Sequence, residues 1–237
     1  MTIDIKPRSA AVFLGVIIVF LALAHLLTVV STYYWGHNYV LGLVPLFNMD
    51  EEQNLPTYFS SAQILLCSCL AFAIAVAEKN RRRRDYLYWI GLCLICLYIS
   101  VDEFASIHER FINQPFRDAS NGPQRFYFSW VIPYGILVVA VVTLYVRFIL
   151  RLPREIGRLI VVSGFVYVTS TVGLELIGGR YCDTHTGPHA DLVLALLVMC
   201  EETLEKAAIL VLVYALMSYL SRYVEGCTFR ITSSPSD

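Results

Sequence analysis

The stretch YLYWIGLCLICLYISVDEFASIHERF, residues 86–111, joins an uncharged apolar run to a group of ionisable side chains. Its first half, Tyr86 to Tyr98, contains no charged residue. The whole chain has the same apolar character, since 57% of its 237 residues are hydrophobic, 16% are charged and the mean hydropathy is +0.61. Soluble domains contain about half apolar and about a quarter charged residues. The composition therefore predicts an all-α, polytopic membrane protein.

Several apolar windows are long enough to cross a bilayer, which requires about 20 helical residues. The windows are 10–31, 57–78, 86–111, 129–150, 157–178 and 190–221. They predict a six-transmembrane-helix bundle in which residues 1–237 form a single integral membrane domain.

Basic residues concentrate on one side of this predicted bundle. The run KNRRRRD at 79–85 and the basic residues between Arg147 and Arg158 fall on the same side as both ends of the chain. Because basic loops favour the cytoplasmic side, we expect both termini to be cytoplasmic and the protein to be multi-pass in the plasma membrane. Membrane lipid is then the main surrounding partner. A net charge of −1 gives no reason to expect nucleic acid.

The third window carries acids in its outer third. Successive helical residues are rotated by about 100°, so residues seven apart return to within about 20° of each other. This periodicity predicts that Asp102 and Glu109 share a face. Glu103 and His108 point in other directions and are weaker members of any single site.

Charged side chains also occur in the fifth and sixth windows. A ridge of side chains four residues apart runs up the fifth window, namely Ser163, Tyr167, Thr171 and Glu175. In the sixth, CEETLEK at 200–206 interrupts an apolar run. Lys206 follows Glu202 by four residues and is expected to pair with it, which leaves Glu201 and Glu205. A charge at mid-bilayer costs about 2.5–3.5 kcal/mol on insertion scales, so these acids need partners.

Carboxylates that face inward from several helices, with imidazoles nearby, are typical of metal sites in helical bundles. We therefore expect a divalent metal ion, with Fe, Mn or Zn as candidates, in the outer half of the bundle. The predicted ligands are Asp102, Glu109, Glu175, Glu202, Glu205 and His108. Glu205 and His108 are also the candidate catalytic residues, and His108 has two alternative roles, metal ligand or proton shuttle. The spacings Glu-x-x-His and His-Glu-x-x-His are absent from every window.

Three functions are compatible with such a site. A metal-dependent membrane hydrolase or oxidoreductase would act on a lipid or another membrane-soluble small molecule. A cation or proton-coupled transporter or channel would use the same carboxylates as a pathway, although the apolar segment from Ala207 to Ala215 argues against continuity to the cytoplasm. A non-catalytic subunit, in an oligomer or a larger membrane complex, is the third function. The acids would then only hold helices together, which fits one buried acid better than several.

Other histidines and cysteines give weaker indications. His25 is alone in the first window and is expected to bond a neighbouring helix. His185 and His189 lie in an outer loop, as solvated residues, as part of a lid or as extra ligands. The pair Cys93 and Cys96 lies in the middle of an apolar window without a second pair, which favours a packing role.

The segments LFNMDEEQNLPTYFSS, LYISVDEFASIHE, VGLELIGG and EETLEK together resemble a group of uncharacterised bacterial polytopic membrane proteins. The resemblance covers about residues 47–210 and rests on an Asp-Glu then His-Glu pattern in one helix and Glu-Glu-x-x-Glu in another. It implies a bacterial inner-membrane protein and brings no settled activity. It also draws attention to Asp102, Glu103, His108, Glu109, Glu175, Glu202 and Glu205. The group is expected to have an apolar residue at position 206, so Lys206 departs from it. The pair of Lys206 with Glu202 is expected to weaken a metal site.

Overall fold

The computed structural model describes residues 6–82, 84–107 and 131–224, and every regular element within these ranges is a helix. The all-α prediction is therefore confirmed for this part of the chain. The elements are α1 (Pro7–Trp35), the short 3-10 helix η1 (Val40–Gly42), α2 (Leu43–Phe47), α3 (Leu55–Asn80), α4 (Tyr86–Ala105), α6 (Val131–Ile149), α7 (Arg154–Val168), the π-helical segment η3 (Thr169–Leu174), α8 (Glu175–Thr184) and α9 (Pro188–Tyr223).

Among the described residues, four helical segments are long and apolar enough to cross a membrane. They are Pro7–Trp35, Leu55–Asn80, Tyr86–Ala105 and the continuous run Arg154–Tyr181 through α7, η3 and α8. A shorter apolar helix covers Tyr134–Ile149. The 36-residue α9 is long enough but contains the ionisable residues of CEETLEK. A membrane protein is therefore indicated, with helices at each of the six predicted windows.

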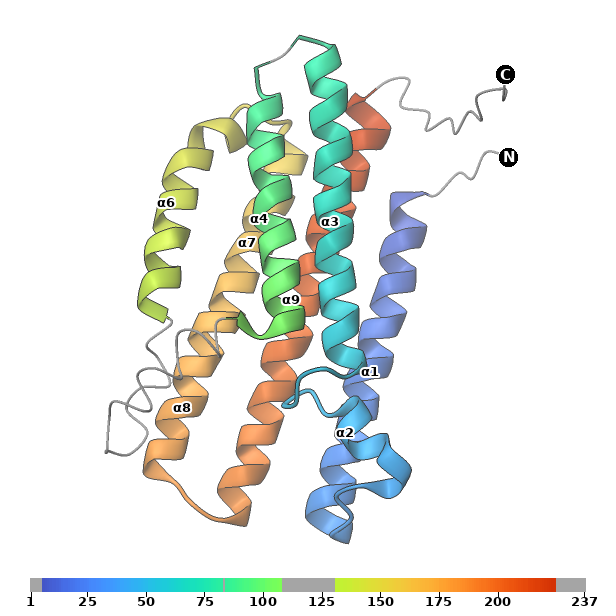
Figure 1. Cartoon of the computed structure of the whole chain (residues 1–237), viewed down its shortest axis with the longest axis vertical. Helices are drawn as coiled ribbons and strands as arrows, with labels where there is room; N and C mark the ends of the chain where they lie inside the picture. Colours follow the sequence, from blue (N-terminus) through green and yellow to red (C-terminus); the bar gives the residue numbers. More distant parts are fainter. Residues whose placement is uncertain (1–5, 83, 108–130, 225–237) are drawn as a thin grey trace, which may run out of the picture.

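The long helices lie side by side, and α9 lies among the others (Figure 1). It packs against α1, α3 and α7, while α4 packs against α3. The start of α1, the α3–α4 connection, the α6–α7 connection and the end of α9 all lie at one end of the bundle (Figure 1). The basic residues of 79–85 and of 147–158 therefore gather at that end.

The helix boundaries have local causes. Asn54 caps the start of α3, because its side-chain oxygen accepts a hydrogen bond from the Thr57 backbone N–H at 3.2 Å, and Pro56 follows within the first turn. Gly36 ends α1 in a left-handed conformation with φ of 68°. At the same outer end, Gly187 and Pro188 separate α8 from α9.

The helix in the third predicted window is interrupted at Ser106. The regular helix α4 ends at Ala105, and Ser106 adopts a left-handed conformation with φ of 53° and ψ of 43°. A residue in that conformation interrupts the helix, so a rotation of 100° per residue cannot be continued to Phe111. The argument that placed Asp102 and Glu109 on one face therefore fails. Glu109 and His108 themselves lie outside the described residues.

The helices α3 and α9 run in the same direction in a constant register. The Cys67 Sγ lies 4.0 Å from the Ile209 carbonyl oxygen, 142 positions later in the sequence. The Tyr219 hydroxyl donates to Glu78 at 3.1 Å, a separation of 141 positions. The Arg81 guanidinium reaches the Tyr223 carbonyl at a separation of 142. Side chains of α3 therefore lie level with those of α9 about 142 positions later.

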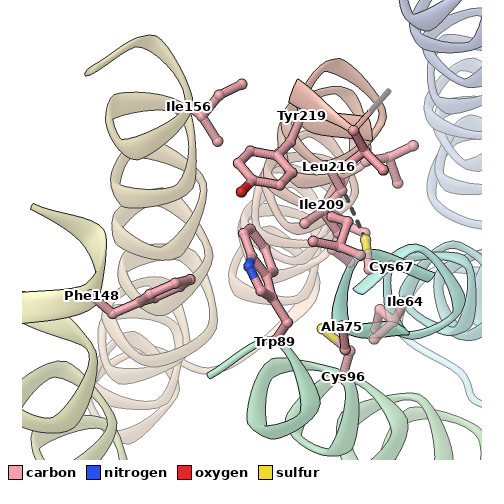
Figure 2. Close-up of a cluster of buried hydrophobic side chains, with 13 residues drawn as sticks. Ile64, Cys67, Ala75, Trp89, Cys96, Phe148, Ile156, Ile209, Leu216 and Tyr219 are labelled. Carbon is pink, nitrogen blue, oxygen red and sulfur yellow. Dashed lines mark hydrogen bonds between the residues drawn. The ribbon is translucent and has the colours of Figure 1, made fainter. Parts of the chain in front are cut away.

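An apolar core joins α3, α4, α6, α7 and α9 (Figure 2). Trp89 is fully buried, with its ring centroid 5.2 Å from that of Phe148 and 4.9 Å from that of Tyr219. Ile209 and Leu216 of α9 complete this core. The core thus forms a packed layer between the polar segment of α9 and the basic end of the bundle.

Candidate functional site

Lys206 lies at the centre of the polar region of the bundle. It is fully buried, with 0% of its surface exposed, although it is one of the longest charged side chains. Its ammonium donates to the Glu202 carboxylate one helical turn earlier in α9. Glu202 is partly exposed, with 26% of its side-chain surface accessible. The pairing expected from the i, i+4 spacing is therefore present, and it connects a buried ammonium to a more accessible carboxylate.

Two further carboxylates lie within electrostatic range of this pair. Glu205, in α9, is buried, and its carboxyl interacts with the side chain of Thr171 in η3. Glu103, in α4, is half-buried and interacts with the side chain of Ser60 in α3. Both interact electrostatically with Glu202 and with Lys206. We call Glu103, Glu202, Glu205 and Lys206 the buried acid cluster.

The charge of the buried acid cluster is unbalanced. Three carboxylates and one ammonium carry a net charge of −2 when all four groups are ionised. An uncompensated charge in a low-dielectric interior is strongly unfavourable, so protons or a bound cation must neutralise the excess. Among the described residues, Lys206 is the cation that interacts with all three carboxylates. The cluster is therefore built to hold additional positive charge.

Asp102 and Glu103 point to different neighbours. The Tyr134 hydroxyl of α6 donates to Asp102 at 3.0 Å and lies 2.9 Å from the Tyr98 hydroxyl. Asp102, itself only 6% exposed, thus joins α4 to α6. Adjacent helical residues are rotated by about 100°, so Glu103 faces the buried acid cluster instead. Periodicity had ranked Asp102 above Glu103, and the structure brings Glu103 to the cluster.

A second group of acids lies nearer the end of the bundle opposite the basic residues. Glu201 of α9 interacts electrostatically with Glu175 of α8, with Glu202 and with Asp50 of the segment after α2. Glu201 and Glu175 are half-buried, and Asp50 is exposed. These carboxylates come from three elements, so acidic side chains extend from the exposed outer segment down to the buried acid cluster.

The predicted ridge on the fifth window faces α9. The Ser163 hydroxyl donates to the Ala208 carbonyl at 2.7 Å. One turn further, Tyr167 interacts with Glu205, and so does Thr171, whose hydroxyl donates to the Tyr167 carbonyl at 2.9 Å. The helix is π-helical over Thr169–Leu174, next to these contacts. Such wide turns occur frequently at functional sites, which draws attention to this level of the bundle.

His25 is fixed by two backbone groups and does not join the buried acid cluster directly. Its Nδ1 accepts a hydrogen bond from the Met49 N–H at 2.9 Å, so its Nε2 carries the proton and donates to the Ala195 carbonyl at 3.4 Å. With 1% exposure, His25 connects α1 to the α2–α3 segment and to α9. The expected bond to a neighbouring helix is thus present.

Replacement of His25 by leucine should destabilise this connection. The buried Met49 N–H would lose its acceptor, and an unsatisfied buried donor costs about 1–3 kcal/mol. The expected result is a lower melting temperature for the protein in detergent, measured by scanning fluorimetry. His37→Leu is the control, because His37 is exposed and its side chain should contribute little. Equal melting temperatures for the two variants would contradict this assignment.

The outer histidines lie apart from the buried acid cluster. His185 is exposed, stacks on Tyr181 with ring centroids 4.3 Å apart and lies 2.9 Å from the Thr184 hydroxyl. His189 is also exposed, in the first turn of α9. The Cys93 Sγ lies 3.3 Å from the Ser68 hydroxyl oxygen, between α4 and α3, in keeping with a packing role.

The predicted metal ligands do not share one coordination point in this arrangement. Within residues 6–82, 84–107 and 131–224, no three His, Cys, Asp or Glu side chains lie close enough together to hold a metal ion. The structure instead arranges Glu202, Glu205 and Glu103 around Lys206 and directs Asp102 to α6, while Glu175 lies near Glu201. His108 and Glu109 are outside the described residues.

A family model described as a domain of unknown function, DUF8692, matches residues 10–220, and the chain belongs to that family. No curated protein and no solved structure matches the chain.

Proposed function

We propose that this member of the DUF8692 family is a multi-pass protein of the bacterial inner membrane, and that its buried acid cluster binds a divalent cation. The six helical windows would all cross the membrane, with both termini in the cytoplasm. This topology is supported by the basic residues of 79–85 and 147–158 at one end of the bundle. Lys206 would then lie roughly 25 Å above Tyr223 at the cytoplasmic end, in the outer half of the membrane.

The net charge of the buried acid cluster is the observation that carries this proposal. One divalent cation would neutralise the excess charge of −2 that Lys206 leaves uncompensated. Glutamate side chains have several rotatable bonds, so Glu103 and Glu205 can turn toward a common ion while the helices stay in place. Glu202 keeps Lys206 as its partner in this arrangement.

The surroundings of the cluster favour a catalytic role over the transport of an ion across the membrane. In the proposed topology the apolar layer of Trp89, Phe148 and Leu216, which Figure 2 shows, would lie between the cluster and the cytoplasmic end. Acids extend in the other direction, toward the outer surface. A bound cation would therefore act as a Lewis acid in a site that a lipid or another membrane-soluble molecule reaches from the bilayer. Such a protein would be a metal-dependent membrane enzyme.

Elemental analysis of the purified protein tests the cation. We expect about one divalent ion per chain in the native protein and much less in Glu205→Gln, which keeps the size of the side chain and removes its charge. Glu155→Gln is the matched control, since Glu155 is exposed and pairs with Arg222 at 2.7 Å, and it should retain the metal. A native protein that is free of metal after growth and purification without chelators would show that the proposal is wrong.

Proton-coupled transport is the second candidate, and it is favoured by one contact. Glu205 interacts with Thr171 and Tyr167, and buried carboxylates in membrane proteins often belong to proton relays. Two protons on the carboxylates would neutralise the same excess charge. Metal analysis separates the two candidates. If protons neutralise the carboxylates, the native protein should contain no metal, whereas a cation site should contain a divalent ion.

A further inference from the structure

Gln63 of α3 has a buried side chain whose polar atoms have no hydrogen-bond partner among the described residues. Only 2% of the residue is exposed. Both its amide oxygen Oε1 and its amide nitrogen Nε2 lack a hydrogen-bond partner among the described residues. Most buried polar side chains in proteins are satisfied, so an amide with two unpartnered atoms needs an explanation. No role was predicted for Gln63 from the sequence.

The position of Gln63 on α3 directs it toward the buried acid cluster. Ser60 and Cys67, which lie within about 60° of Gln63 on the helix, contact Glu103 and the Ile209 carbonyl respectively. The constant separation of 141–142 positions between α3 and α9 places Gln63 level with Glu205. Gln63 thus lies on the side of α3 that faces α9, at the depth of the cluster.

An unpartnered glutamine amide at this place should make the fold less stable than leucine would, unless a ligand binds the amide. Leucine has a similar volume, has no polar atoms to desolvate and suits the apolar residues nearby, such as Ile64. A bound ligand would remove the penalty, because the amide oxygen can coordinate a cation while the amide N–H groups donate to a carboxylate.

We propose that Gln63 is a ligand-binding residue of the cation site, with Oε1 as a neutral oxygen ligand beside the carboxylates of Glu103 and Glu205. This inference rests on the proposed function and narrows it. Every candidate ligand atom of this group is an oxygen, and His25 is already bonded to two backbone groups. Carboxylate and carbonyl oxygens select hard cations, so the site would take Mn²⁺, Mg²⁺ or Ca²⁺.

Titration of the full-length protein in detergent with Mn²⁺ tests this assignment. We expect wild type to bind one Mn²⁺, Gln63→Leu to bind at least about tenfold more weakly, and Gln63→Glu, which keeps an oxygen at the same place, to bind as tightly or more tightly. Ser68→Ala is the control on the same helix, because Ser68 bonds the Cys93 carbonyl at 2.9 Å, away from the cluster. It should bind Mn²⁺ like wild type.

The melting temperatures of the metal-free proteins supply a second measurement. If Gln63 exists to bind a ligand, metal-free Gln63→Leu should melt at or above the temperature of wild type, because it loses two unpartnered polar atoms. A purely structural glutamine predicts a lower melting temperature. Equal Mn²⁺ affinity for wild type and Gln63→Leu would overturn the role of Gln63 and leave the cation site standing. Absence of Mn²⁺ binding by wild type would overturn the cation site, and Gln63 with it.

Discussion

Lys206→Met should be among the most destabilising substitutions in the protein. It removes the ammonium that compensates Glu202, Glu103 and Glu205 and leaves their carboxylates with no described cation among them. Removal of one partner from a buried ion pair typically costs about 3–5 kcal/mol. At about 2–4 °C per kcal/mol for a chain of this size, the melting temperature in detergent should fall by roughly 6–20 °C.

Two further variants show whether the loss arises from charge. Lys79→Met is the matched control, because Lys79 is exposed at the end of α3 and its removal should shift the melting temperature little. The double variant Lys206→Met with Glu202→Gln should recover part of the loss, since one unpaired carboxylate disappears with the lysine. A single variant that melts at the temperature of wild type, or a double variant that melts below the single variant, would contradict a compensating role for Lys206.

Trp89→Ala should destabilise the protein to a similar extent for a different reason. The indole of Trp89 is fully buried between Phe148 and Tyr219 and connects α4 to α6 and α9 (Figure 2). Replacement of a buried aromatic side chain by alanine leaves a cavity and costs about 3–5 kcal/mol. The measurement is again the melting temperature in detergent, which should fall by several degrees or more.

Trp35→Ala is the control for this prediction. Trp35 ends α1 and is 66% exposed, so its replacement should leave the melting temperature nearly unchanged. Similar shifts for Trp35→Ala and Trp89→Ala would mean that the apolar layer does not hold α4, α6 and α9 together. The amount of metal bound to Trp89→Ala should equal that of wild type as long as the protein folds, because Trp89 lies in the apolar core and not in the buried acid cluster.

The helices were predictable from the sequence and some of their ends were not. Long apolar runs set the positions of α1, α3 and α9 because a run of about 20 apolar residues favours a helix of that length. The end of α4 at Ala105 depends on the left-handed backbone of Ser106. Serine is not a strong helix terminator, and no proline or glycine marks the position, so residues 86–111 gave no sign of the break.

The acids of the candidate site were predictable as a group, while their partners were not. Charges within the apolar run of α9 were evident from composition alone, and the Glu202–Lys206 pair followed from helical spacing. The choice between Asp102 and Glu103 depends on which helix packs against each side of α4, and periodicity within one helix contains no such information. Gln63 carries no charge and differs little from its neighbours in hydropathy, so only its buried, unpartnered amide distinguishes it.

The π-helical segment η3 lets two parts of one membrane-crossing helix be adjusted separately. The lower part is held to α9 by Ser163 at Ala208, and the upper part presents Glu175 toward Glu201. A π turn holds one residue more than an α turn, and loss of that residue would rotate everything beyond it by about 100°. An insertion or deletion at Thr169–Leu174 would thus change which side chains of α8 face Glu201, while the contact between Ser163 and Ala208 stays as it is.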